Sequence, residues 1–172
     1  MTGPDPADVD DTTRAVVAAQ LGRPPRAVRA VAHRCSCGLP DVVETNPVLP
    51  DGSPFPTLYY LTCPRAASAI GRLESEGVMR GLNDRLAEEP ELAQRYAAAD
   101  AAYRARRAAL GGRADLPTAG GMPVRVKCLH ALVAHALAAG PGVNPIGDEA
   151  LALVDDWGAR GPCVDLAAGE PA

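Results

Sequence analysis

Residues 57–65, TLYYLTCPR, mark the point at which the chain changes from predicted strands to predicted helices. Thr57 to Thr62 combine β-branched and aromatic residues and form the strongest predicted strand of the sequence. From Arg65 to Glu76 the apolar residues return at helical spacing. The sequence therefore predicts a sheet before this point and helices after it.

Two shorter strands are predicted earlier in the chain. Ala27 to His33 alternates in the manner of a strand, and Asp41 to Thr45 is a second short candidate. A loop rich in proline and glycine, residues 47–56, separates them from the strand at Thr57. We expect the first third of the chain to form a small antiparallel sheet.

Helical periodicity and breakers divide the rest of the chain. The predicted helices cover residues 12–21 (capped by Thr12 or Thr13), 65–76, 78–89, 90–110, 124–139 (begun by Pro123) and 148–157 (capped by Asp148). We therefore predict one α+β domain over residues 12–157, in which four or five of these helices pack on the sheet. Residues 1–11 are predicted to be a disordered acidic segment, and residues 158–172 a flexible tail.

Composition limits the classes of function. The chain has 172 residues, 47% hydrophobic residues and a formal net charge of −4. This net negative charge does not provide the overall basic surface that nucleic-acid binding needs, so a nucleic-acid partner is not expected. No apolar run approaches the roughly 18–20 residues of a membrane helix, and the acidic start does not fit a secretory signal. We expect a cytoplasmic protein whose thiols stay reduced.

Four cysteines stand in short, unusual contexts. They are Cys35 and Cys37 in HRCSCG, Cys63 in LTCP and Cys128 in VKCLH. Thiols from separate segments that meet in space usually bind a metal ion or cluster, or exchange disulfides. Cys63 ends the strand next to the Cys35–Cys37 segment, so these three can easily be adjacent. Cys128 is predicted to lie one turn inside the helix begun by Pro123.

The occupant of a four-cysteine site is left open by the sequence. A zinc ion with four sulfur ligands or an iron–sulfur cluster would use the same thiolates, while buried packing is the alternative without metal. His33, His130 and His135 are candidates for further ligands or for hydrogen-bond partners of the ligands. His130 lies about 200° around a helix from Cys128, so it joins the site only if the helix begins later than predicted. Cys163, in the tail, is interpreted as incidental.

Three other segments offer weaker candidates. Gly120 and Gly121, followed by Arg125 and Lys127, resemble an anion-binding helix start without the phosphate-loop pattern. The loop at 140–149 places Asn144, Asp148 and Glu149 together, either as catalytic groups or as the start of a helix that suits its dipole. The arginines of the 90–110 helix and of the residues after it, from Arg95 to Arg113, are interpreted as a solvated face, with RNA or an acidic partner as the alternative.

Four strings carry a resemblance to a known family: HRCSCGLPDVVET, DGSPFPTLYYLTCPR, GRLESEGVM and GGMPVRVKCLHALVAHALAAGPGVNPIGDEAL. Over residues 16–153 the chain resembles the DUF501 family, which is found chiefly in actinobacteria. The family has no known function, so the resemblance supports the cysteine site but does not indicate which metal ion or cluster it would bind. Its genes often lie beside those for enolase, a septum-formation initiator protein and an exopolyphosphatase-like enzyme.

Three functional hypotheses follow. The first is a metal- or iron–sulfur-binding protein with Cys35, Cys37, Cys63 and Cys128 as ligands. The second is an interaction module without an active site, which binds a protein partner in cell division or envelope growth. The third is an enzyme that uses Cys128 as a nucleophile, or a cluster with an open iron, near the 148–149 loop.

Overall fold

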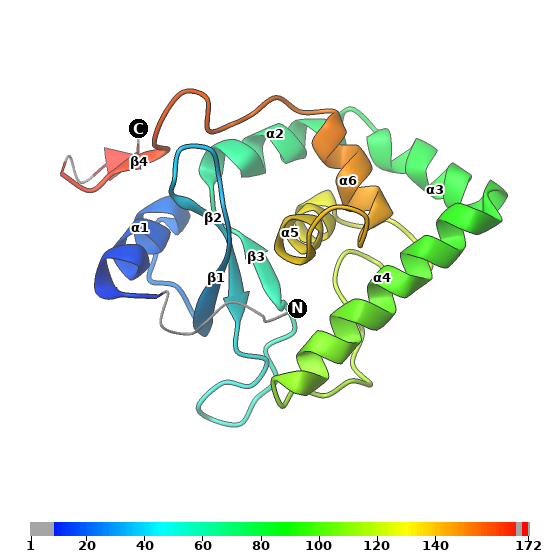
Figure 1. Cartoon of the computed structure of the whole chain (residues 1–172), viewed down its shortest axis with the longest axis horizontal. Coiled ribbons are helices and arrows are strands. Elements are labelled where there is room, and N and C mark those ends of the chain that lie inside the picture. Colours follow the sequence, from blue (N-terminus) through cyan, green and yellow to red (C-terminus); the bar gives the residue numbers. More distant parts are fainter. Residues whose placement is uncertain (1–8, 168–169, 172) are drawn as a thin grey trace.

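The computed structural model describes residues 9–167 and 170–171, and it combines a three-stranded antiparallel sheet with helices (Figure 1). In chain order the elements are α1 (Asp11–Leu21), β1 (Val28–Arg34), β2 (Pro40–Thr45), β3 (Tyr59–Leu61), α2 (Pro64–Ser75), α3 (Val78–Glu88), α4 (Pro90–Ala109), α5 (Leu129–Ala139), α6 (Pro145–Ala152), β4 (Val164–Asp165) and β5 (Glu170–Pro171). The predicted α+β class is confirmed.

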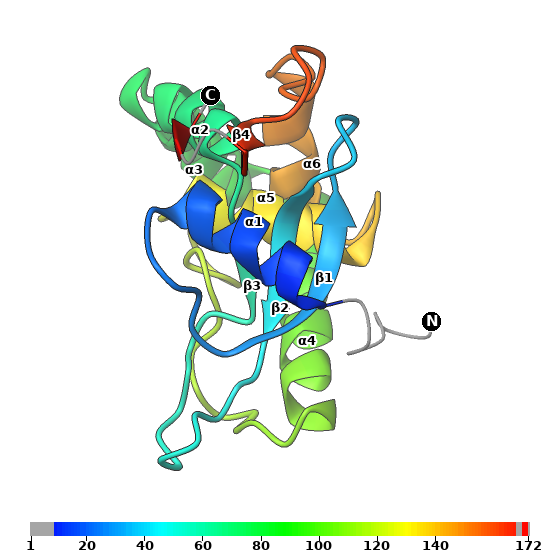
Figure 2. The ribbon, with the colours of Figure 1, turned by 90° about the vertical axis from the view of Figure 1, so that its left-hand side faces the viewer.

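The sheet is covered on both faces. Its strands lie in the order β1-β2-β3, and all six residues of the central β2 are buried. Because neighbouring side chains of a strand point to opposite faces, Val42 joins the main core with α5, whereas Val43 joins Val17 of α1 in a second cluster. Figures 1 and 2 show α1 on one side of the sheet and α5 on the other.

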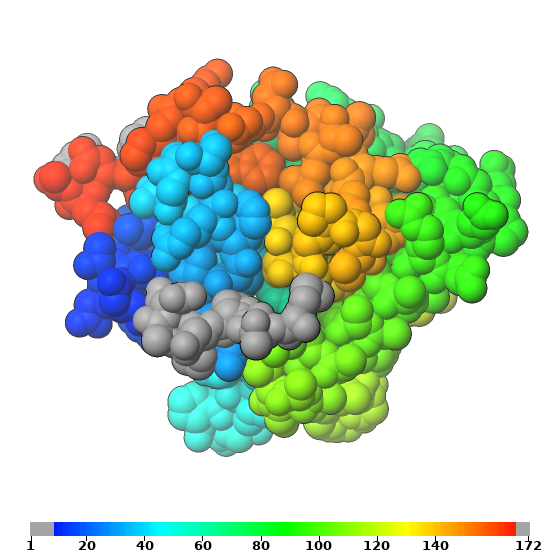
Figure 3. Space-filling view, viewed as in Figure 1, coloured from blue at the N-terminus to red at the C-terminus, as the bar shows by residue number. Residues whose placement is uncertain are grey.

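The helix α5 occupies the centre of the molecule. Six of its residues are buried: Leu129, Leu132, Val133, Ala134, His135 and Ala136. It contacts the sheet, α2 and α6, and Figure 3 shows its C-terminal end and the following loop, in gold, between the sheet and the green α4. A helix that is apolar on nearly all sides belongs in such a core.

The N-terminal part of the fold begins earlier than predicted. The side chain of Asp10 caps α1 by accepting a hydrogen bond from the backbone N–H of Thr13 at 2.7 Å, so neither Thr12 nor Thr13 is the cap. Asp10 and Asp11 therefore belong to the helix start and not to the predicted disordered segment. Residues 1–8 of that segment lie outside the described residues.

The helix α5 begins at Leu129, five residues after the predicted start at 124. Asn83 of α3 explains the delay, because its side chain bonds both backbone groups of Val126: Oδ1 accepts from the N–H at 2.8 Å and Nδ2 donates to the carbonyl at 3.0 Å. These two backbone groups are therefore not available for the hydrogen bonds of a helix. Gly120 and Gly121, with φ of 71° and 97°, fold the preceding segment into turns.

The C-terminal segment also differs from its prediction. Asn144, not Asp148, caps α6, and its Oδ1 accepts from the N–H of Gly147 at 2.9 Å. Beyond residue 158, Cys163 and Val164 are buried in the main core, and β4 pairs with β5. Cys163 is therefore a core residue and not an incidental one.

Gly147 marks the crossing of α6 over α5. A Cβ built on this glycine would lie 2.7 Å from Cβ of Ala136 and would also meet the backbone of Leu132. We expect Gly147→Ala to lower the free energy of unfolding by about 1–3 kcal/mol through overpacking, as measured by urea denaturation. Gly81→Ala is the matched control, because its Cβ would meet nothing within 4 Å in α3. That control should be neutral or stabilising by up to about 1 kcal/mol. Equal effects of the two substitutions would contradict the crossing argument.

Candidate metal centre

The end of α2 and the start of α5 bring three side chains together: Glu74, Cys128 and His130. Their ligand atoms all lie within 4.8 Å of one another. Cys128 is the N-cap residue of α5, in an extended conformation, and His130 is the second residue of that helix. Glu74 reaches them from the last turn of α2.

Hydrogen bonds fix the orientation of two of these groups. The Oε1 atom of Glu74 accepts from the backbone N–H of Leu129 at 2.7 Å, and it lies 3.2 Å from Nδ1 of His130. The other ring nitrogen, Nε2, lies 3.0 Å from the carbonyl oxygen of Ala67. Glu74 therefore also satisfies one of the free N–H groups at the start of α5, where the helix dipole favours a negative charge.

The electrostatics of the group favour charged forms of the thiol and the imidazole. A hydrogen bond with His130 is the main cause that lowers the pKa of Cys128, and burial opposes it. The same interaction raises the pKa of His130 to about 9, with support from the carbonyl of Ala67 and the carboxylate of Glu74. All three residues are half-buried, so water reaches them.

The sequence identified only part of this group. Cys128 was a predicted ligand, and His130 was expected to join it only if the helix began late, which is the case. Glu74 was missed, because an isolated glutamate near the end of an amphipathic helix belongs to no ligand motif. Only the packing of α2 against α5 reveals it.

The four predicted cysteine ligands are not gathered into one group. Cys35 and Cys37 interact with each other in the turn between β1 and β2, and burial is the main cause that raises the pKa of Cys35 to about 12. Cys63 interacts with Cys163, which lies 100 residues further along the chain. Within the described part of the chain, the ligand-spaced group that contains Cys128 holds no other cysteine. The all-sulfur site stays a prediction that this arrangement does not favour.

Cys63 and Cys163 form a buried thiol pair. The Nε2 atom of Gln20 donates to Sγ of Cys163 at 3.2 Å, and the hydrogen bond with Cys63 is the main cause that lowers the pKa of Cys163. The same bond raises the pKa of Cys63. The negative charge of the pair is therefore favoured on Cys163.

The two other candidate histidines have partners that are not cysteines. The Nδ1 atom of His33 lies 2.7 Å from Oδ1 of Asp41, a carboxylate that is fully buried. His135 is buried in the core, where its ring stacks on Tyr59 and its Nδ1 lies 3.2 Å from Nδ2 of Asn144. Neither histidine belongs to the ligand-spaced group of Glu74, Cys128 and His130.

The residues of the predicted anion loop support the fold. Gly120, Gly121, Arg125 and Lys127 precede α5 and do not form its first turn. A Cβ on Gly120 would lie 2.5 Å from Leu132, and one on Gly121 the same distance from the carbonyl oxygen of Arg125, so close packing explains both glycines.

The acidic groups of the 148–149 loop have structural partners as well. Asp148 accepts from the N–H of Gly142 at 2.8 Å, and Glu149 pairs with Arg85 of α3. Together with the capping role of Asn144, these contacts favour the interpretation of this loop as a helix start.

The fold and this site define an α+β protein with a candidate metal centre at the N-terminus of its central helix. A family described as "Protein of unknown function (DUF501)" matches residues 31–152, so the chain belongs to that family. No curated protein and no solved structure matches the chain. Among the described helices, none combines the length and the apolar character needed to cross a bilayer.

Proposed function

We propose that the protein binds one zinc-type divalent metal ion through Glu74, Cys128 and His130. A carboxylate, a thiolate and an imidazole are the three ligand types that zinc takes in proteins. The observation that carries the proposal is the mutual spacing of their ligand atoms, all within 4.8 Å.

The best-defined distance within the group fits shared coordination. Nitrogen and oxygen ligands of a tetrahedral zinc ion lie about 3.4 Å apart, given metal–ligand distances of about 2.0–2.2 Å. The distance between Nδ1 of His130 and Oε1 of Glu74 is 3.2 Å. This separation is about 0.2 Å shorter than the ligand–ligand value, and it is also that of an ordinary histidine–carboxylate contact.

The surroundings of the ligands support the same role. A metal-bound histidine usually donates its other ring N–H to a carbonyl or carboxylate, and Nε2 of His130 faces the carbonyl oxygen of Ala67 at 3.0 Å. The carboxylate of Glu74 is held by the N–H of Leu129. Metal binding would require the loss of the proton on Nδ1 of His130, the nitrogen that faces Glu74, while Nε2 would keep its N–H for the carbonyl oxygen of Ala67.

Three protein ligands leave a fourth position open, as in catalytic zinc sites, whereas structural sites are closed by four. The half-buried position of all three residues supports such access. A bound zinc ion would supply Lewis acidity there and lower the pKa of a bound water. An iron–sulfur cluster is less favoured, because such clusters are held mainly by several thiolates.

The test is zinc titration of the full chain after chelator treatment under reducing conditions, by calorimetry and elemental analysis. We expect one ion per chain, and we expect Cys128→Ser and His130→Ala to weaken binding more than about 100-fold, since even the loss of an outer hydrogen-bond partner costs about 10–100-fold. Glu74→Gln should weaken it as well. Cys37→Ser is the matched control and should bind like the wild type.

Cobalt(II) gives a second readout, because a thiolate ligand produces a charge-transfer band that Cys128→Ser should abolish. The proposal fails if the wild type takes up no stoichiometric ion, or if Cys128→Ser binds as tightly as the wild type. Loss of binding in Cys37→Ser would restore the four-cysteine site. A metal-free protein with rapid alkylation of Cys128 would favour thiol chemistry, and one with slow thiols and a stable partner would favour the interaction module.

A further inference from the structure

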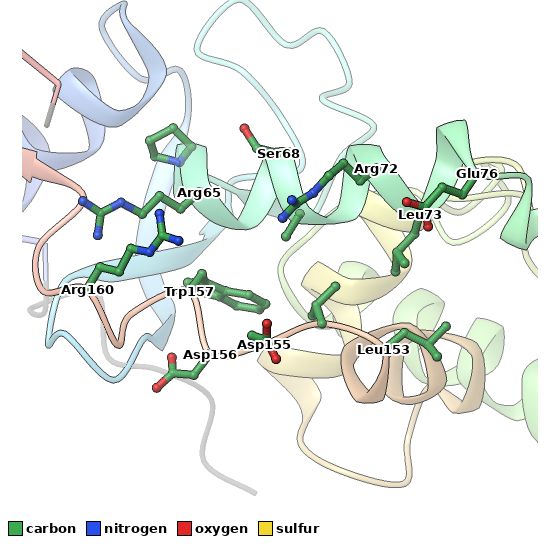
Figure 4. A pocket seen from close by; sticks show the side chains of 13 residues that line it. Arg65, Ser68, Arg72, Leu73, Glu76, Leu153, Asp155, Asp156, Trp157 and Arg160 are labelled. Atoms are coloured by element: carbon green, nitrogen blue, oxygen red, sulfur yellow. The ribbon is translucent and has the colours of Figure 1, made fainter.

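A groove of about 800 Å³ lies between α2 and residues 153–160 (Figure 4). Its α2 wall includes Arg65, Ser68 and Arg72, and its other wall includes Trp157 and Arg160. Glu74 lies about 200° around α2 from Arg72, since each residue turns a helix by about 100°. The groove is therefore on a different side of α2 from the candidate metal centre. Trp157 and Arg160 also lie beyond residues 31–152, which the family matches.

Trp157 is the only tryptophan of the chain, and its position in the groove is fixed. Its Nε1–H donates to Oδ2 of Asp41 at 3.2 Å, and Asp41 is fully buried and paired with His33. One edge of the indole is thus anchored in the core. Figure 4 shows the ring between α2 and the 153–160 segment, where it lines the groove. Such a ring is a preorganised platform for a flat ligand.

Guanidinium groups gather at one end of the same groove. Figure 4 shows Arg65 and Arg160 together at this end, with Glu76 at the other. Nη1 of Arg65 donates to the carbonyl oxygen of Gly161 at 2.9 Å, which holds the side chain in place. Arg72 and Arg160 have no side-chain partner among the residues that the structure describes. Their donors are therefore free for a ligand.

Among the described residues, no carboxylate that lines the groove forms an ion pair with Arg65, Arg72 or Arg160. Asp156 is engaged by the hydroxyl of Ser36 at 2.7 Å and by the backbone N–H of Gly158 at 2.9 Å. Asp155, by contrast, is exposed and lies beside the tryptophan in Figure 4. It offers acceptors to hydroxyl or amino groups of a ligand, while the planar forks of the arginines match phosphate oxygens.

We propose that this groove binds a nucleoside monophosphate, with the base on Trp157, the phosphate at Arg65 and Arg160, and the sugar hydroxyls near Asp155. The groove volume lies within the range of about 300–1,000 Å³ that is usual for small-ligand sites. The ligand is a free nucleotide or the phosphorylated 5′ end of an RNA, because both present the same chemistry. The proposal does not depend on metal binding.

Trp157 supplies the readout. Adenosine monophosphate added to the full chain should change the tryptophan fluorescence in a saturable way, and calorimetry should give the same dissociation constant. We expect Arg160→Ala to weaken binding at least tenfold, whereas Arg95→Ala, at an exposed position of α4, should leave it unchanged. The variant Cys128→Ser should bind as the wild type does, which separates this proposal from the metal site.

Three results would overturn the proposal: no saturable change, equal affinity in Arg160→Ala, or inorganic phosphate binding as tightly as the nucleotide. A 5′-phosphorylated oligonucleotide distinguishes the two possible ligands, a free nucleotide and the 5′ end of an RNA. Tighter binding of the oligonucleotide than of the free nucleotide supports an RNA end as the ligand, and weaker binding supports the free nucleotide.

Discussion

Replacement of Arg107 by methionine is expected to lower the free energy of unfolding by about 3–4 kcal/mol. Arg107 lies on α4 and is 1% exposed. Its guanidinium donates to three backbone carbonyls, those of Pro56 at 3.2 Å, Leu116 at 2.9 Å and Pro117 at 3.0 Å. Methionine preserves most of the volume but removes three hydrogen bonds from a charged donor, and such bonds contribute about 1.5–3 kcal/mol each. The carbonyl of Leu116 keeps a second donor, Nη1 of Arg104 at 3.0 Å, so the loss falls mainly on the bonds to Pro56 and Pro117.

The contacts of Arg107 also hold two loops against α4. The loop before β3, near residue 56, is bound by Arg107 at the carbonyl of Pro56, and the loop after the helix is bound at Leu116 and Pro117. Arg104 of the same helix also donates to the carbonyl of Leu116, at 3.0 Å. The ring of Tyr103 adds a cation–π contact, with the guanidinium carbon 5.1 Å from the ring centroid. The substitution should therefore loosen both loops at once.

Urea denaturation followed by circular dichroism measures the effect of Arg107→Met. The matched control is Arg95→Met, because Arg95 lies on the same helix but is exposed. We expect the control to stay within about 0.5 kcal/mol of the wild type. Equal loss of stability in the two variants would show that the carbonyl contacts contribute nothing specific.

The sequence does not predict which arginines of α4 face the core. They were interpreted as a solvated face, yet Arg106 pairs with the fully buried Glu44 at 2.8 Å and Arg107 is buried. Arg104 pairs with Asp100 on the same helix. The cause is the alanine-rich sequence of α4: small residues on every side leave the helix without a clear apolar stripe, so periodicity cannot show which arginines face inward.

The sheet and most helices were predictable because their signals are local. Alternation and β-branched residues located all three strands of the sheet, and proline and glycine located most helix ends to within one or two residues. The prediction failed where one specific side-chain hydrogen bond, distant for α5 and local for α6, decided the outcome. Asn83 delays α5 by binding Val126, and Asn144 replaces Asp148 as the cap of α6.

The candidate metal centre was half predictable for the same reason. Cys128 and His130 are close in sequence, so a correct helix start is enough to place them together. Glu74 enters through the packing of α2 on α5, which no local pattern contains. The predicted grouping of Cys63 with the other three cysteines is not found for a related reason. Cys63 contacts Cys163, which lies in a segment predicted to be a flexible tail.

His135 is expected to make the protein about 3 kcal/mol less stable at pH 4 than at pH 7.5, apart from the contributions of other groups. Its ring is buried between Tyr59, stacked at 5.7 Å between centroids, and Tyr103, edge-on at 5.3 Å. Burial lowers the pKa of His135 to about 4, and the negative charge of Asp100 opposes this shift weakly.

Asn144 explains why the imidazole must be neutral. Its Oδ1 accepts from the N–H of Gly147, so its amide nitrogen faces Nδ1 of His135 at 3.2 Å. Nδ1 therefore accepts this hydrogen bond, and a proton there would set two donors against each other in the core. The pKa is about 6.5 in the unfolded chain, so the neutral form gives full stability above that pH. The stability is lost as the pH falls from about 6.5 towards 4.

The measurement is the free energy of unfolding in urea between pH 7.5 and pH 4 for the wild type and for His135→Phe. Phenylalanine keeps the ring contacts and cannot take up a proton, although it leaves the amide of Asn144 without its acceptor at every pH. The variant should start less stable than the wild type at pH 7.5 and lose about 3 kcal/mol less on acidification, because carboxylates titrate equally in both proteins. Parallel pH profiles would mean that the folded core accepts a protonated His135, and that the orientation assigned to Asn144 is wrong.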